Sequence, residues 1–137
     1  MNETDNPLLS DWHGPFGLPP FERIRAEHFE PALVEAMRRH RAELDALAAQ
    51  DAPVDFENTA AALDRSGELL YRLDALLGNL TASDTSPALQ AVQRAMAGPM
   101  AAHDTAVRTH PGVFARLDRL HQQRDHGALT PEQRRLV

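Results

Sequence analysis

Histidine is the residue type in this chain best suited to metal or acid–base chemistry, and seven histidines occur among 137 residues. The closest groupings are His103 beside Asp104, His110 one heptad later, and His121 one turn before Asp125. A helical metal site of the HExxH type needs two histidines on one helix face and a glutamate directly after the first. No histidine here is followed by Glu. We therefore expect surface or partner-paired histidines; the alternative, a histidine-based metal protein, predicts stoichiometric bound metal.

Other patterns that carry chemistry are also missing. The carboxylates fall mainly on the polar faces of the expected helices, without a buried pair whose pKa values would separate into an acid and a base. Gly14 and Gly17 in "HGPFG" lack the strand and the Lys-Ser/Thr of a phosphate loop, and no nucleophile elbow occurs. The sequence therefore predicts no catalytic, cofactor-binding or metal-binding residue in this chain.

The composition indicates a helical protein. Apolar residues make up 42% of the chain and are mostly Leu and Ala, whereas Val and Ile together number only seven, so strand formers are scarce. The net charge is −6, and no arginine cluster lies beside aromatic residues, which predicts that nucleic acid is not a partner. Cysteine is absent. No signal-peptide pattern and no membrane-length apolar run occur, so we expect a cytoplasmic protein without a membrane partner.

Proline divides the chain into two parts. Residues 1–25 are expected to form an extended Pro-rich arm, because residues 6–21 hold four prolines and two glycines among large apolar side chains. These apolar side chains require burial, either on the chain's own bundle or on a larger body elsewhere. Residues 26–137 are expected to form a helical bundle.

The first two helices follow from apolar spacing. One is predicted over about 31–50, with an earlier turn from 26, and His40 lies in its apolar stripe. A second is predicted from Asp55, whose carboxylate caps it, to about Leu80. Gly67 inside this helix is expected to permit a close helix crossing.

Three further helix starts carry proline. A third helix is predicted over about 87–109, with His103 in its stripe and a kink at Gly98-Pro99. A fourth opens at His110-Pro111 and ends at Gly127, and a fifth is announced by Thr130. The expected fold is all-α, with antiparallel helical hairpins or a bundle of about four helices, and the fifth helix truncated.

Four segments, taken in order, resemble a known family: "NPLLSDWHGPFGLPPFERIRAEHFEPALVEAM", "DFENTAAALDRSGELL", "NLTASDTSPALQAVQ" and "LTPEQRRLV". They are similar to the N-terminal part of the thimet oligopeptidase family of zinc metallopeptidases, in its bacterial oligopeptidase A and peptidyl-dipeptidase branch. The most specific stretches are "PPFERIRAEHFEPAL" and "FENTAAAL".

This resemblance implies a larger helical enzyme whose two lobes enclose a deep channel for short peptides. Its zinc would be held by the histidines of HExxH and a downstream Glu, none of which has a counterpart here. The chain is therefore expected to be a non-catalytic, inactive N-terminal region that forms part of the channel lobe. Its partners would be the remainder of the polypeptide and, through the full-length enzyme, short peptides, with zinc bound only in that parent.

The alternative is a stand-alone helical protein-interaction module that grips a partner helix. A helix start at Thr130 with few residues after it favours a longer chain, in which Val137 is a cut. A stop codon directly after Val137 would favour the module, and a long frame containing HExxH the peptidase. Apolar surface left uncovered in the isolated chain is expected to cause self-association, as a dimer or by exchange of arms.

Overall fold

The computed structural model describes residues 6–126 and 129–137, in which every regular element is helical. The long helices are α1 (Phe29–Ala48), α3 (Glu68–Ser83), α4 (Pro87–Arg108) and α5 (Pro111–Gln122). The short elements are α2 (Ala62–Arg65), α6 (Pro131–Leu136), a π-helical turn (Phe56–Ala61) and 3-10 turns at Pro15–Gly17, Phe21–Arg23 and Ala26–His28. The all-α prediction is confirmed. Within the described ranges, no helix is long and apolar enough to cross a membrane.

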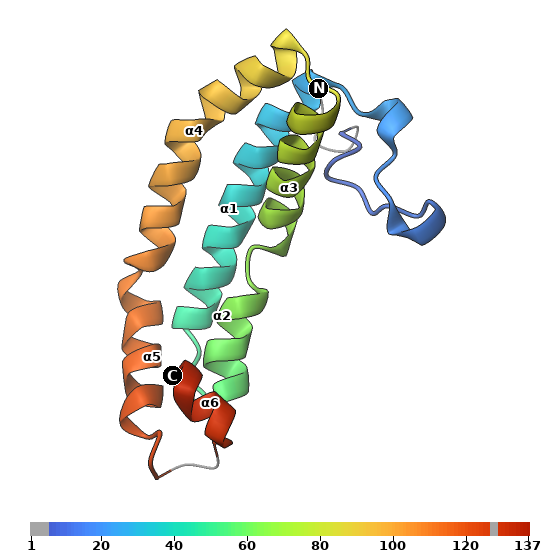
Figure 1. Ribbon diagram of the computed structural model, residues 1–137. Coiled ribbons are helices and arrows are strands. Elements are labelled where there is room, and N and C mark those ends of the chain that lie inside the picture. The colour runs from blue at the N-terminus through green and yellow to red at the C-terminus, as the bar shows by residue number, and fades with distance from the viewer. Residues whose placement is uncertain (1–5, 127–128) are drawn as a thin grey trace.

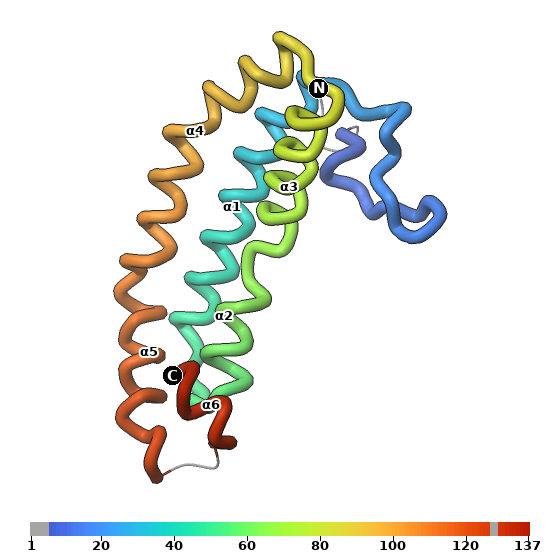
Figure 2. Tube along the Cα trace, in the orientation of Figure 1, coloured from blue at the N-terminus to red at the C-terminus, as the bar shows by residue number. Residues whose placement is uncertain are grey.

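The helices other than α6 form three columns, of which the middle one along the chain runs antiparallel to the other two (Figure 1). One column is α1; the π-helical turn, α2 and α3 return beside it, and α4 followed by α5 makes the third (Figure 2). The central column is α1, which contacts α3, α4 and α5. Helices α4 and α5 run in the same direction because Pro111 holds His110 in an extended conformation, which interrupts the helix without reversing the chain.

The predicted helix starts are confirmed by their caps. The side chains of Asp55, Ser86, His110 and Thr130 each accept a hydrogen bond from the backbone N–H three residues later. Such a bond satisfies one of the donors that a helix start leaves unpaired. The predicted end of the fourth helix at Gly127 falls outside the described residues, and α5 itself ends at Gln122.

The predicted continuous helix from Asp55 to Leu80 is wrong, because the chain breaks at Ser66 and Gly67. Helix α2 ends at Arg65 and α3 begins at Glu68, with Gly67 in the left-handed region at φ 73° and ψ 16°. The apolar spacing continues across the break, so periodicity alone does not reveal it. Gly67 permits a close approach, but to a side chain and not to a helix: a Cβ there would lie 2.6 Å from ring atoms of His40. By contrast, α4 continues unbroken through Pro99 and curves along the bundle (Figure 1).

The arm docks on its own bundle through its first residues. The Asn6 side chain donates to the His28 carbonyl at 2.9 Å and accepts from the Leu8 N–H at 3.0 Å, and Leu8 is fully buried. The guanidinium of Arg72 lies over the Trp12 ring, with Arg72 Cζ 4.3 Å from the ring centroid. Farther along the arm, three apolar side chains are exposed: Phe16, Leu18 and Phe21. The first part of the arm is therefore buried on the chain's own bundle, whereas the apolar side chains of its second part are exposed.

The core is divided into two clusters. The larger gathers leucines of α1 and α3 around Phe29 and Leu73, together with Leu8 from the arm and Met96 from α4. The smaller centres on Leu44, Leu47 and Val113, where α1 meets α5. Between the two, each column carries a buried polar residue instead of an apolar one: His40, Ser66 and His103.

Replacing Gly67 by Ala tests the break between α2 and α3. The methyl group would meet the His40 ring and the backbone would be strained, so we expect G67A to lower the free energy of unfolding by about 3 kcal/mol. Urea denaturation measures this value. The control is G78A on α3, where an added Cβ meets nothing within 4 Å and helix propensity should stabilise by about 0.5–1 kcal/mol. Equal effects of the two substitutions would contradict the argument.

Candidate functional site

Hydrogen bonds between three polar side chains, one from each column, link the columns at a level between the two core clusters. His103 Nε2 of α4 lies 3.0 Å from His40 Nδ1 of α1, and His40 Nε2 lies 3.1 Å from Ser66 Oγ. Ser66 Oγ in turn donates to the Leu63 carbonyl at 2.6 Å. Both histidines are only 2% exposed. These three side chains, which we call the histidine layer, are the most chemically interesting group in the described part of the chain.

The hydrogen bonds fix the direction of the histidine layer. Because the Ser66 hydroxyl gives its only hydrogen to the Leu63 carbonyl, its oxygen must accept from His40, which places the His40 proton on Nε2. The unprotonated His40 Nδ1 then accepts from His103 Nε2–H. Among the residues that the structure describes, no partner lies within hydrogen-bond reach of His103 Nδ1, which is left as a buried acceptor. An orphaned acceptor is a smaller penalty than an orphaned N–H, which favours this arrangement over the reverse.

This direction bears on catalysis, since a serine beside two histidines resembles a nucleophilic triad. In a working triad the histidine accepts the serine proton, and a third group orients the histidine. Here the histidine donates, and the serine proton is held by a backbone carbonyl. Ser66 is therefore not activated as a nucleophile, and the layer serves to connect helices.

Burial sets the charge of the histidine layer. Desolvation lowers the pKa of His40 below its ordinary value, against the opposing effect of the Glu43 carboxylate. Desolvation also lowers the pKa of His103, and the neighbouring His40 and Arg41 act in the same direction. Both rings are thus neutral at neutral pH, as the hydrogen bonds between them require.

An open pocket of about 560 Å³ lies over the histidine layer. His40 and Ser66 line it together with Tyr71 of α3, whose ring meets the His40 ring edge-on with centroids 6.1 Å apart. Its other walls come from α2, α4 and α5: Leu63, Asp64, Val107, Arg108, His110, Val113, Phe114 and Leu117. The pocket therefore reaches the break between α2 and α3 from outside.

The histidine groupings singled out in the sequence are not brought together. His103 pairs with His40 and not with Asp104. His110 caps α5 through Nδ1 and approaches Asp45 through Nε2 at 3.1 Å, while His121 contacts Arg124 and the Val137 carbonyl. Among residues 6–126 and 129–137, no three His, Asp or Glu side chains are grouped so as to hold a metal ion.

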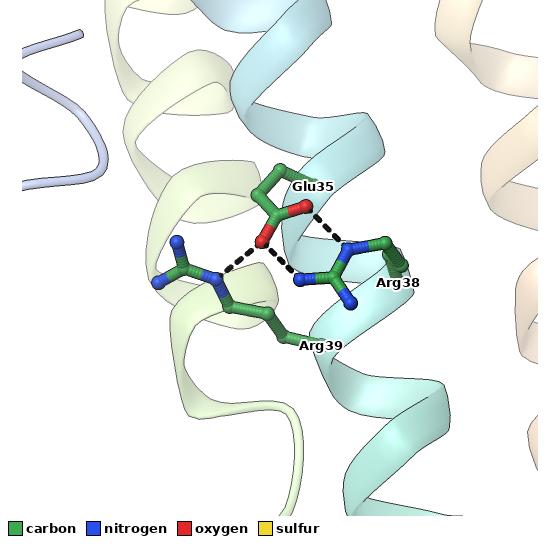
Figure 3. A network of polar contacts seen from close by, with 3 residues as sticks. All are labelled: Glu35, Arg38 and Arg39. Carbon is green, nitrogen blue, oxygen red and sulfur yellow. Dashed lines mark hydrogen bonds and ion pairs between the residues drawn. The ribbon is translucent and has the colours of Figure 1, made fainter. Parts of the chain in front are cut away.

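A second buried ionisable group is Glu35 on α1 (Figure 3). Arg38 donates to it through two nitrogens at 2.6 and 2.7 Å, and Arg39 donates at 2.6 Å. The hydrogen bonds from Arg38 and then Arg39 outweigh burial and lower the pKa of Glu35 from 4.5 to about 2. A carboxylate so held cannot give a proton near neutral pH, so Glu35 is not a general acid.

A third buried polar group is Arg116 of α5, which is 3% exposed. One terminal nitrogen donates to the carbonyls of Gln50 and Ala52, and the other to Asn58 Oδ1 and Thr59 Oγ1. All four acceptors are neutral oxygens. Arg116 therefore ties α5 to the loop after α1 and to the π-helical turn.

The sequence carried a partial signal for the histidine layer. Spacing places His40 and His103 on the apolar stripes of their helices, which indicates that both are buried. Their pairing spans 63 residues, and Ser66 has no sequence pattern of its own. Arg116 was missed for the same reason, since its acceptors lie 57–66 residues away.

Comparison with known proteins relates the chain to peptidases. The chain is homologous to the N-terminal part of peptidases of the thimet oligopeptidase family, which confirms the resemblance inferred from the sequence. It is 37% identical over 134 residues to dipeptidyl carboxypeptidase of Salmonella typhimurium, covering 98% of this chain and 20% of that protein. It is 29% identical over 132 residues to oligopeptidase A of Escherichia coli, covering 96% and 19%. The chain thus spans about a fifth of the length of these relatives. No protein-family model matches it.

Replacing Glu35 by Gln tests the ion network. A lowered carboxylate pKa contributes stability above the ordinary pKa of 4.5, and this stability is lost as the pH falls towards about 2. We expect E35Q to cost about 1–2 kcal/mol at neutral pH, because solvent screens the two arginines, and almost nothing near pH 2. Urea unfolding across this pH range is the measurement, with D74N on the exposed face of α3 as control. A cost of E35Q that does not change with pH would argue against the network.

Replacing Arg116 by Lys tests the clamp on the π-helical turn. A lysine keeps the charge but has a single nitrogen with three N–H donors in place of two terminal nitrogens facing four oxygens, so we expect R116K to cost about 2–4 kcal/mol. The exposed neighbour Arg119 supplies the matched control, since R119K should change stability by less than about 0.5 kcal/mol. Thermal unfolding of both variants would reveal whether charge alone is enough.

Proposed function

We propose that this chain is the non-catalytic N-terminal helical region of a zinc-dependent oligopeptidase or peptidyl-dipeptidase that hydrolyses short peptides. The observation that carries the proposal is the collinear similarity over 134 residues to proteins named dipeptidyl carboxypeptidase. In this role the three columns would form part of the lobe around the substrate channel. The zinc would be bound by residues outside this chain, since the chain contains no HExxH.

The chemistry of the described residues supports a scaffold role. Ser66 gives its proton to a carbonyl, Glu35 is held ionised by two arginines, and Arg116 is spent on neutral oxygens. Ser66 and Arg116 thus join segments of the bundle, and Glu35 is paired within α1. Binding and hydrolysis of short peptides would fall to the remainder of the polypeptide, in a cytoplasmic enzyme.

The exposed part of the arm supports a larger parent. Phe16 is 98% exposed, and Leu18 and Phe21 lie near it in the chain, so a wide apolar surface is left uncovered. The remainder of the same polypeptide would cover it. In the isolated chain the same surface would favour self-association.

The test compares the product of the full reading frame with the 137-residue chain. We expect the full product to cleave a short internally quenched peptide and to lose activity with a zinc chelator, because the metal supplies the attacking water. The chain alone should show no chelator-sensitive cleavage. Fluorescence assays with and without added zinc provide the measurement.

Two outcomes would count against the proposal. Chelator-sensitive cleavage by the chain alone would place catalysis among these residues. A reading frame that ends directly after Val137 would favour the alternative, a helical protein-interaction module.

A further inference from the structure

The histidine layer coincides with two discontinuities of the fold. It lies between the larger and the smaller core cluster, and it ends on Ser66, where the second column breaks. The break is held by few bonds: the Gly67 N–H donates to Glu43 Oε2 at 2.7 Å, and the Tyr71 N–H donates to the Gly67 carbonyl at 3.0 Å. At this level the columns are joined by hydrogen bonds between neutral rings and a hydroxyl.

We propose that the histidine layer is a pH-sensitive latch: neutral His40 and His103 hold the columns together at the Ser66–Gly67 break, and protonation opens it. The proposal does not depend on the peptidase assignment, since every group in the latch belongs to the described residues.

The geometry explains why a proton opens the latch. His40 Nδ1 accepts from His103 Nε2–H across 3.0 Å, so a proton added to His40 Nδ1 sets two N–H groups against each other. A proton on His103 Nδ1 keeps the bond but leaves a charge in a buried site without a partner. Either event is relieved when α4 and the break move apart and water enters from the pocket over His40.

The surrounding charges do not neutralise the protonated latch. The ionisable groups that face the two rings or line the pocket come from all three columns: Arg41, Glu43, Asp64, Tyr71, Asp104, Arg108 and His110. Glu43 spends one carboxylate oxygen on the Gly67 N–H, and Asp104 is paired with Arg108 at 3.0 Å. Burial prevails over both carboxylates, because the pKa values of His40 and His103 are lowered despite them.

The sign of the pH dependence follows from linkage. A histidine whose pKa is lowered in the closed state and ordinary in the open state binds its proton mainly when open. The latch is therefore fully closed above the ordinary value of 6.5 and opens as the pH falls below it. For one proton, lowering the pH from about 7.5 to about 5.5 should raise the open population about tenfold.

Hydrogen exchange of the backbone amides tests the latch in the wild-type protein. After correction for intrinsic exchange, we expect protection of the Ser66, Gly67 and Tyr71 amides to fall about tenfold over this pH range. The amide of Leu76, in the middle of α3, should change much less. In NMR titrations, the pKa values of the His40 and His103 rings should lie below the ordinary histidine value of 6.5. Unchanged protection, or titration of both rings at or above that value, would overturn the proposal.

A substitution separates the latch from general effects of acid. H103Q removes one titrating ring, keeps a donor to His40 Nδ1, and has an amide that can turn to accept from a protonated His40, so the pH dependence at the break should become smaller, with the burial of His40 accounting for what remains. H126Q, at an exposed histidine, should behave as wild type. A full pH response retained in H103Q would refute the latch; if H103Q does not fold, the wild-type titration decides.

Discussion

The histidine layer is the constraint to which the rest of the bundle is fitted. His40 can reach Ser66 only because the second column breaks there, and the break can lie against the His40 ring only because residue 67 has no Cβ. The left-handed conformation of Gly67 then sets where α3 begins and how its leucines face α1. The hydrogen bonds from His103 to His40 and from His40 to Ser66 thus link the left-handed conformation of Gly67 to the alignment of the three columns. A polar layer of this kind adds little net stability but favours one alignment of helices over its neighbours.

The buried side chains of Glu35 and Arg116, which carry charge, follow different rules. Glu35 keeps its charge by facing two guanidinium groups on its own helix, so its network needs no tertiary contact. Arg116 keeps its charge by gathering backbone and side-chain oxygens from two segments distant in sequence, so it exists only in the folded chain. The charge of Glu35 is therefore balanced by ion pairs within α1, the two histidines in the middle of the bundle are neutral, and the Arg116 guanidinium on α5 is surrounded by neutral oxygens. Ser66 lines the pocket but is not activated as a nucleophile, because its proton is held by the Leu63 carbonyl.

What the sequence predicts here depends on how local each signal is. The starts at Ser86, His110 and Thr130 are capping signals contained within four residues, and all three are found where expected. The break at Gly67 was missed because leucines continue at helical spacing on both sides, and only the opposing His40 ring makes the break necessary. The homology likewise rests on segments read in order along the chain, whereas the pairing of His40 with His103 requires the fold. Local chemistry is thus predictable, and contacts between columns are not.

The clamp made by Arg116 also bears on the order of folding. The π-helical turn is a wide, poorly bonded form of helix, and its Asn58 and Thr59 oxygens are held by a residue 57–58 positions later. The turn cannot reach its final geometry until α5 has formed and docked. Helix α1 can form early from neighbouring residues, but the π-helical turn must wait for a long loop to close. We therefore expect "FENTAA", which belongs to one of the two most specific stretches of the sequence, to take its native shape late in folding.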